Sequence, residues 1–178
     1  MNESTAIAHL ILERHALHPE LDALLGALLE QCFQHRAEPG EVLCREGDAT
    51  RDLFFLLDGE VEVRMRDLCG EDRPIATLLA PTMFGHMGMI DAAPRSATCV
   101  AHGQARLAVM GRELFDELLD DPGPGGDILR RLMLAAMSQQ LAKGNAALRI
   151  FLDPSIEAPE NFAAERLRHA SGTLEGWR

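Results

Sequence analysis

The spacing of apolar residues changes twice along the chain, from a helical period to a strand-like period and back. In residues 5–17 and 19–32 the apolar positions recur three and four residues apart, which predicts two amphipathic helices. Pro19 separates them, because proline is tolerated in the first turn of a helix and not in its interior. The chain therefore begins with a helical region, which we place at residues 1–36.

From Glu41 onward, short apolar runs alternate with turn sequences. Residues 60–66 alternate strictly and predict a strand with one buried face, while the apolar run 53–57 predicts a buried strand. Asp58-Gly59 joins these two runs and is typical of a tight hairpin. Further strands are predicted at residues 42–44, 75–79, 96–101 and 105–109. Short strands separated by frequent turns predict an antiparallel sandwich or barrel, which we place at residues 37–111.

The helical period returns in residues 112–152. A short helix is expected at 112–119 and a break at 120–126, and Asp127 is expected to cap a long helix over 128–151. The tail, residues 153–178, has room for one short helix at 160–170. It is either a flexible end or a docking segment anchored by Trp177.

Residues 84–98 contain the candidate chemistry: a glycine turn, a short helix, and a Pro-Arg-Ser sequence. Gly85 permits an unusual φ and a close backbone approach, and backbone N–H groups at a helix start favour an anion. Arg95 offers a charged fork to two phosphate oxygens, and Ser96 adds a hydroxyl donor. These residues predict a cradle for one small phosphate; the alternative is that Arg95 is a solvated surface charge, as an arginine after a proline in a loop usually is.

The same segment resembles the phosphate-binding cassette of the cyclic-nucleotide-binding domains, the family of the catabolite activator protein and of cyclic-nucleotide-dependent kinases and channels. The family pattern is Phe-Gly-Glu, a short helix, and Pro-Arg-Ser/Thr-Ala. The matching residues are Phe84, Gly85, Pro94, Arg95, Ser96 and Ala97, while His86 replaces the family's Glu. Residues 39–48 and 53–63 resemble two further family motifs, so the resemblance covers residues 20–152. It implies a mainly β fold with flanking α-helices: an antiparallel β jelly-roll (double-stranded β-helix) with N-terminal helices and a long C-terminal helix.

The resemblance implies cAMP or cGMP as the ligand, with no cofactor, no metal and no catalytic residue. Arg95 and Ser96 would hold the cyclic phosphate, backbone groups would assist, and His86 would stand where the family's Glu binds the ribose 2′-OH. A neutral His is a weaker acceptor for this hydroxyl than a carboxylate. The implied ligand-binding residues are Phe84, Gly85, His86, Met87, Arg95, Ser96, Ala97 and Asn145. Asn145 is placed near the base, but a solvated position on the long helix is the alternative.

The resemblance further implies a non-enzymatic signal-transduction module in which nucleotide binding moves the long helix and changes a surface for a protein partner. The long helix either pairs with a second copy to form a homodimer or is an ordinary packing helix. The net charge of −11 argues against DNA, which requires a basic face. Residues 153–178 are too few for the helix-turn-helix domain of the catabolite-activator relatives.

Two other functions stay open at this point. The Glu-to-His change fits a degenerate domain that kept the fold and acts as a nucleotide-independent protein interaction domain. A metalloenzyme on a jelly-roll barrel could use His35, His86 and His102, but the H-x-H pair of such barrels is absent from the sequence. Glycine-rich nucleotide-binding and Walker patterns are absent as well.

The composition places the protein in a reducing compartment. The four cysteines form no CxxC pair, and Cys32 and Cys44 lie in apolar contexts that predict buried thiols. No signal peptide is visible, and no apolar run is long enough to span a bilayer. We therefore expect a cytoplasmic protein that does not bind membranes.

Overall fold

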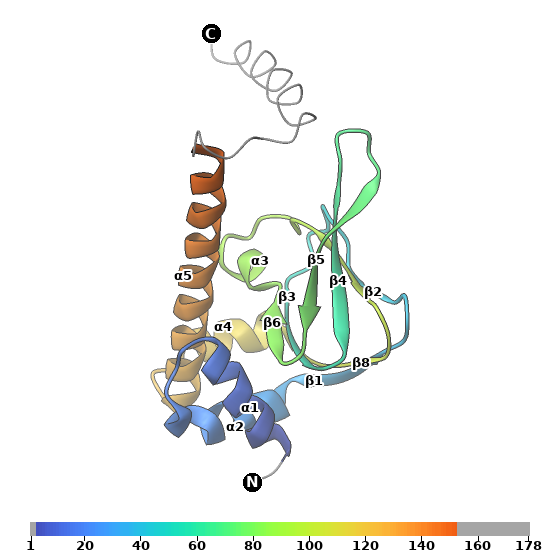
Figure 1. Ribbon diagram of the computed structural model, residues 1–178. Helices are drawn as coiled ribbons and strands as arrows, with labels where there is room; N and C mark the ends of the chain where they lie inside the picture. The colour runs from blue at the N-terminus through green and yellow to red at the C-terminus, as the bar shows by residue number, and fades with distance from the viewer. Residues whose placement is uncertain (1–2, 153–178) are drawn as a thin grey trace. The chain divides into compact units, whose positions relative to one another are not determined.

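The computed structural model describes residues 3–152 and divides into two units, residues 1–137 and residues 138–178 (Figure 1). Two four-stranded antiparallel sheets form the centre of the first unit, with strand orders β1-β8-β3-β6 and β2-β7-β4-β5. The strands are β1 (Phe33–Ala37), β2 (Val42–Cys44), β3 (Asp52–Asp58), β4 (Glu60–Arg66), β5 (Asp72–Leu79), β6 (Thr82–Phe84), β7 (Thr98–Ala101) and β8 (Ala105–Gly111). This arrangement confirms the prediction of an antiparallel jelly-roll with flanking helices.

The helices lie before, within and after the strands. They are α1 (Glu3–Arg14), the 3-10 helix η1 (Pro19–Leu21), α2 (Asp22–Gln31), α3 (His86–Ile90), α4 (Arg112–Asp120) and α5 (Pro124–Leu152). The predicted helices at the start of the chain and the two that follow the barrel are therefore present. The tail with its expected helix at 160–170 and Trp177 lies outside the described residues.

Strand β3 is buried on both faces, which explains its unbroken apolar run. Leu53 and Phe55 belong to the hydrophobic cluster formed with the helices, and Phe54 and Leu56 belong to the cluster between the two sheets. Successive side chains of a strand point to opposite faces, so one run of four apolar residues serves both clusters. The helix-side cluster also contains Met89 of α3, so the candidate site is attached directly to this core.

Several elements differ from those expected from the sequence: β5 begins at Asp72 and not at residue 75, and β7 begins at Thr98 and not at residue 96. Strand β1 begins at Phe33, inside the region placed with the N-terminal helices. It has mostly exposed residues and owes its conformation to pairing with β8. The three-residue strand β6 is too short to give a periodic signal. Helix α5 begins at Pro124 and not at Ile128, because proline fits the first turn of a helix. Asp127 therefore lies inside the helix, where it pairs with Arg131, and the prediction that it caps the helix is wrong.

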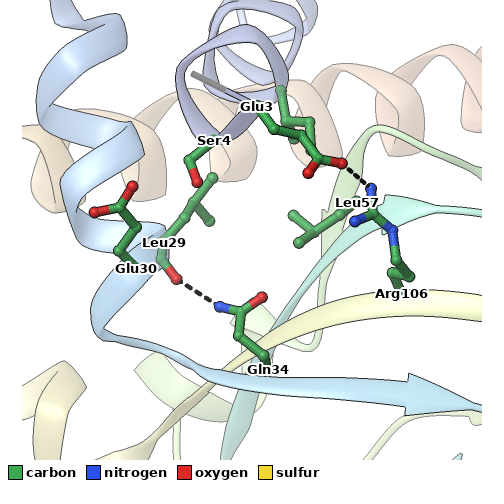
Figure 2. A pocket seen from close by; sticks show the side chains of 8 residues that line it. Glu3, Ser4, Leu29, Glu30, Gln34, Leu57 and Arg106 are labelled. Carbon is green, nitrogen blue, oxygen red and sulfur yellow. Dashed lines mark hydrogen bonds and ion pairs between the residues drawn. The ribbon is translucent and has the colours of Figure 1, made fainter.

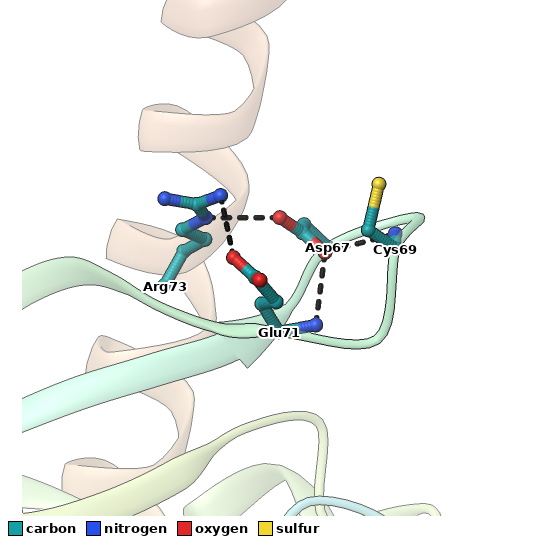
Figure 3. Close-up of polar contacts among 4 residues, drawn as sticks. All are labelled: Asp67, Cys69, Glu71 and Arg73. Carbon is teal, nitrogen blue, oxygen red and sulfur yellow. Dashed lines mark hydrogen bonds and ion pairs between the residues drawn. The ribbon is translucent and has the colours of Figure 1, made fainter.

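The β4–β5 hairpin extends beyond the rest of its sheet, and one aspartate organises its tip (Figures 1 and 3). Oδ1 of Asp67 accepts hydrogen bonds from the backbone N–H groups of Cys69 and Glu71, and Oδ2 accepts one from Arg73. These bonds, the one from Arg73 foremost, lower the pKa of Asp67. The thiol of Cys69 points away from these partners and is exposed (Figure 3).

The second unit is described by the C-terminal part of α5. Its residues 140–146 are exposed, and Leu141 and Leu148 present large apolar side chains to solvent. Within residues 3–152, none of the helices combines the length and the apolar character that crossing a membrane requires.

Candidate functional site

The cassette (residues 84–98) leaves β6 through a glycine in the left-handed region. Gly85 has φ +83° and ψ 0°, and α3 follows it for five residues. Asp91 then ends the helix, and its side chain accepts a hydrogen bond from the backbone N–H of Ala93 at 3.0 Å. This turn leads through Pro94 to Arg95, so that the arginine side chain lies against the start of the short helix, where it contacts Gly85.

Gly85 is required for its conformation and for its closeness to neighbours. A Cβ at this position would lie 2.8 Å from Nη1 of Arg95, 2.8 Å from the backbone O of Asp52 and 3.2 Å from Cδ2 of Phe54. Any side chain here would therefore collide with the arginine and with a backbone atom. The glycine keeps room for the guanidinium directly beneath the start of α3.

The side chain of Arg95 is buried, with 4 % of it exposed. It donates hydrogen bonds to Thr50 Oγ1 at 3.4 Å, to Gly85 O at 3.0 Å and to Asp52 O at 2.7 Å. Its guanidinium carbon lies 5.6 Å from the centre of the Phe54 ring. The alternative of a solvated surface charge is therefore wrong for Arg95, and its role in a phosphate cradle stays a prediction.

The charge of this buried arginine is only weakly compensated. All three hydrogen-bond acceptors are neutral, and among residues 3–152 the nearest carboxylate oxygen, Oδ2 of Asp52, lies 3.9 Å away on a partly exposed side chain. Burying a cation is costly unless an opposite charge accompanies it. The three hydrogen bonds use three of the five guanidinium hydrogens, which leaves two for an anion.

The backbone of Arg95 is held as firmly as its side chain. Its N–H donates to Asp48 O at 2.9 Å, and its carbonyl accepts from the N–H of Gly47 at 2.8 Å. Next to this pair, the N–H of Glu46 donates to Oγ1 of Thr98 at 3.0 Å. The loop after β2 therefore fixes the strand-like end of the cassette.

His86, the first residue of α3, has an imidazole whose two nitrogens are buried. Neither nitrogen has a hydrogen-bond partner among the described residues. Burial lowers the pKa of His86 below its ordinary value of 6.5, so the ring is neutral near pH 7. A neutral ring has one donor and one acceptor, and both are unused here.

A pocket of about 300 Å³ lies elsewhere, between α1, α2 and the β1-β8-β3 part of the first sheet (Figure 2). Its only arginine, Arg106, is paired with Glu3 at 2.6 Å, and Gln34 donates to Leu29 O. None of its lining residues belongs to the cassette. It therefore offers no unpaired cation to a phosphate, and the cassette is the stronger candidate.

Comparison with known proteins supports the assignment of the fold. Residues 34–121 match the family model of the cyclic nucleotide-binding domain. This part of the chain belongs to the cyclic nucleotide-binding domain family.

A cAMP-dependent protein kinase regulatory subunit from Mucor circinelloides f. lusitanicus is similar to this cyclic nucleotide-binding domain. It is 30% identical over 120 residues, which cover 67% of this chain and 25% of the relative. The chain thus spans about a quarter of the length of that curated relative.

Two solved structures share the fold. A cyclic nucleotide-binding domain from Methylobacillus flagellatus superposes with a TM-score of 0.65 at 27% identity, covering 89% of this chain and 85% of that chain. The catabolite activator protein of Thermus thermophilus gives a TM-score of 0.66 at 23% identity over 77% of this chain and 61% of that chain. The family and fold inferred from the sequence are confirmed.

The other predicted ligand residues of the domain differ in how far they are exposed to solvent. Phe84 is buried and stacks on Phe54 with ring centres 4.9 Å apart, so its side chain supports the cassette from within the core. Met87 and Ser96 are exposed, and Ala97 is half-buried. Asn145 is exposed on α5 in the second unit, so its contact with a base stays a prediction.

Three further residues of the domain contribute to the site and were not found from the sequence. Thr50 and Asp52 accept hydrogen bonds from Arg95, and Arg112 of α4 donates one to Met89 O of α3 at 2.8 Å. Arg112 also pairs with Asp116 at 2.7 Å. These contacts join segments far apart in sequence, and no local motif indicates them.

Proposed function

We propose that this domain binds a cyclic nucleotide, cAMP or cGMP, through the cassette, and that binding regulates a protein partner. The observation that carries the proposal is the buried guanidinium of Arg95, which has neutral acceptors and two hydrogens left for an anion. Two phosphate oxygens would supply the missing negative charge and accept the two remaining hydrogen bonds of the guanidinium. The family of the domain and the cAMP-dependent kinase relative support this choice of ligand.

The cyclic phosphate fits the charge of the site better than an ordinary nucleotide phosphate. A cyclic phosphodiester has one negative charge, matching one arginine, whereas a phosphomonoester has about −1.5 to −2 near pH 7. Around Arg95 the ligand would also meet the hydroxyl of exposed Ser96 and the backbone N–H groups of Met87 and Ala97. AMP is therefore the natural comparison ligand for cAMP.

His86 would meet the ribose. Its neutral ring would accept a hydrogen bond from the 2′-OH, which would satisfy one of the two buried nitrogens that have no partner in the described part of the chain. A neutral acceptor contributes about 1–2 kcal/mol less than a carboxylate, so the domain would bind nucleotide roughly 5- to 30-fold more weakly than with Glu at this position.

Replacing His86 by Glu is therefore expected to tighten binding of cAMP roughly 5- to 30-fold, measured by isothermal titration. The matched control is His102→Glu, which makes the same change at an exposed histidine on the turn between β7 and β8. That control should leave the affinity unchanged. Equal affinities of the two variants would remove His86 from the ribose site.

The signal would leave the cassette through the contact between α3 and α4. Arg112 joins Met89 O to Asp116, so a ligand that moves α3 also pulls on α4, which leads directly into α5. A ligand shifts such an equilibrium only by its differential affinity for the two arrangements. The protein partner would then recognise the changed surface of the C-terminal helices.

A second copy of the chain is the proposed neighbour of α5. Leu134 in the first unit is 69 % exposed, and Leu141 and Leu148 in the second unit are 67 % and 59 % exposed. Leu141 and Leu148 are seven residues apart and share one helix face, as in a helix–helix seam. Homodimer formation through this helix would bury these side chains.

The test is a calorimetric titration of the full chain with cAMP and with cGMP, with AMP as the control ligand. Binding of either cyclic nucleotide with one site per chain supports the proposal. If the fold serves only as a nucleotide-independent interaction domain, none of the three ligands releases heat.

A further inference from the structure

Two cysteines lie opposite each other on neighbouring strands beside Arg95. Cys44 ends β2, Cys99 lies in β7, and the two are register partners in the antiparallel ladder. Both side chains are buried in the cluster between the two sheets. Partners in such a ladder have Cα atoms about 4.5–5.5 Å apart, which lies within the Cα range of about 4.4–6.8 Å found in disulfides.

This pairing depends on a β-bulge. Val42 pairs with Val100, and a regular ladder would next place Cys44 opposite Thr98. The register shift between Val42 and Cys44 leaves Leu43 as the extra residue and brings Cys44 opposite Cys99. Residues directly opposite in a ladder project from the same face of the sheet, so the bulge places the two thiols side by side.

The surroundings of the two thiols favour one as the nucleophile. Hydrogen bonding with Cys99 foremost, and the positive charge of Arg95, lower the pKa of Cys44 to about 7, although burial acts in the opposite direction. The same hydrogen bond and burial raise the pKa of Cys99. By contrast, burial raises the pKa of Cys32 to about 12. Because the thiolate is the reactive form, Cys44 is the most reactive of the buried thiols.

We propose that Cys44 and Cys99 form a redox modification site, in which hydrogen peroxide converts the two thiols into an intramolecular disulfide. The Cys44 thiolate attacks one peroxide oxygen, the O–O bond breaks, and hydroxide leaves, giving a sulfenic acid on Cys44. The Cys99 sulfur then attacks the Cys44 sulfur, the S–O bond breaks, and the departing hydroxide takes a proton to form water. In total, two thiols lose two electrons and two protons, and hydrogen peroxide is reduced to two waters.

The disulfide would act on the segment that contains Arg95. The chain from Cys44 to Asp48 runs beside the chain from Arg95 to Cys99, joined by the Glu46–Thr98 and Gly47–Arg95 hydrogen bonds. A covalent link at the Cys44–Cys99 end would tie the backbone of the arginine to β2. Formation of the link follows from the cysteine geometry alone and does not depend on nucleotide binding.

The test uses the full chain with Cys32→Ser and Cys69→Ser, which leaves only Cys44 and Cys99. The folded protein is treated with stoichiometric hydrogen peroxide near pH 7.5, unfolded, alkylated and analysed by mass spectrometry. We expect the oxidised chain to be lighter by two hydrogens than the reduced, unalkylated chain and to take up no alkyl group. Digestion should give a peptide pair linked through Cys44 and Cys99. A thiol reductant should restore both alkylation sites.

The matched control keeps the other two cysteines, Cys32 and the exposed Cys69, in a Cys44→Ala/Cys99→Ala chain. It should form no intramolecular disulfide under the same treatment; a Ser version replaces it if the Ala version does not fold. The proposal is overturned if Cys44 and Cys99 stay alkylatable at a peroxide dose that oxidises Cys69 in the wild-type chain. Separate oxidation of the two thiols without a link would also overturn it.

Discussion

Replacing Arg95 by alanine is expected to weaken cyclic-nucleotide binding by about 2–5 kcal/mol, or roughly 30- to 5,000-fold. Arg95 provides the cation of the cassette, and its side chain is buried, so water cannot replace it at the phosphate. Calorimetric titration measures the change. The control is Arg36→Ala, an exposed arginine on β1, which should bind as the wild type does.

Arg95 also supports the fold, and a second variant separates the two roles. Without it, the carbonyls of Gly85 and Asp52 lose a buried donor. Arg95→Gln keeps donor groups near these carbonyls and removes the charge. We expect this variant to unfold near the wild-type temperature and to have lost most of its affinity. Wild-type affinity in a folded Arg95→Gln protein would contradict the role of the charge.

Replacing Gly85 by alanine is expected to lower the free energy of unfolding by about 2–5 kcal/mol. The left-handed conformation costs an alanine about 1–2 kcal/mol, and the collision with Arg95 and the backbone of Asp52 adds about 1–3 kcal/mol. Because the new methyl group displaces the guanidinium, nucleotide affinity should fall together with stability. Denaturant titration gives the first quantity and calorimetry the second.

The matched control for this substitution is Gly70→Ala. Gly70 has nearly the same φ, +84°, but a Cβ there would meet nothing within 4 Å. The free energy of unfolding of this variant should therefore fall only by the cost of the left-handed conformation, about 1–2 kcal/mol, and its affinity for the nucleotide should not change. Equal losses of stability in the two variants would show that closeness to Arg95 does not matter at Gly85.

The parts of the fold predicted correctly are those with a local signal. The apolar run of β3, the strict alternation of β4 and the turn at Gly59 each determine their own conformation, and with the other short strands they predict an antiparallel sandwich or barrel. The more specific jelly-roll came from the resemblance to the cyclic-nucleotide-binding domains. Strand β1 has no such signal, because its residues are mostly exposed and its pairing with β8 comes from distant sequence. The start of α5 was misplaced because Pro124 and two glycines looked like a break.

In the candidate site, too, the features with a local sequence signal were predicted and those that depend on distant segments were not. The Gly85 turn and the Pro94-Arg95-Ser96 sequence were visible as a motif, and the predicted burial of Cys32 and Cys44 is confirmed. The burial of Arg95 was not predicted, because it depends on carbonyls of Asp52 and Gly85 that only the folded sheet brings together. The bulge that pairs Cys44 with Cys99 likewise depends on two strands that are far apart in sequence.

Isothermal titration calorimetry of the full chain with cAMP and with cGMP tests most directly the central claim that the domain binds a cyclic nucleotide through Arg95. We expect at least one cyclic nucleotide to bind with one site per chain, AMP to bind more weakly, and Arg95→Gln to abolish the signal while remaining folded. Absence of heat for both cyclic nucleotides at millimolar concentration, with correctly folded wild-type protein, would contradict the proposal.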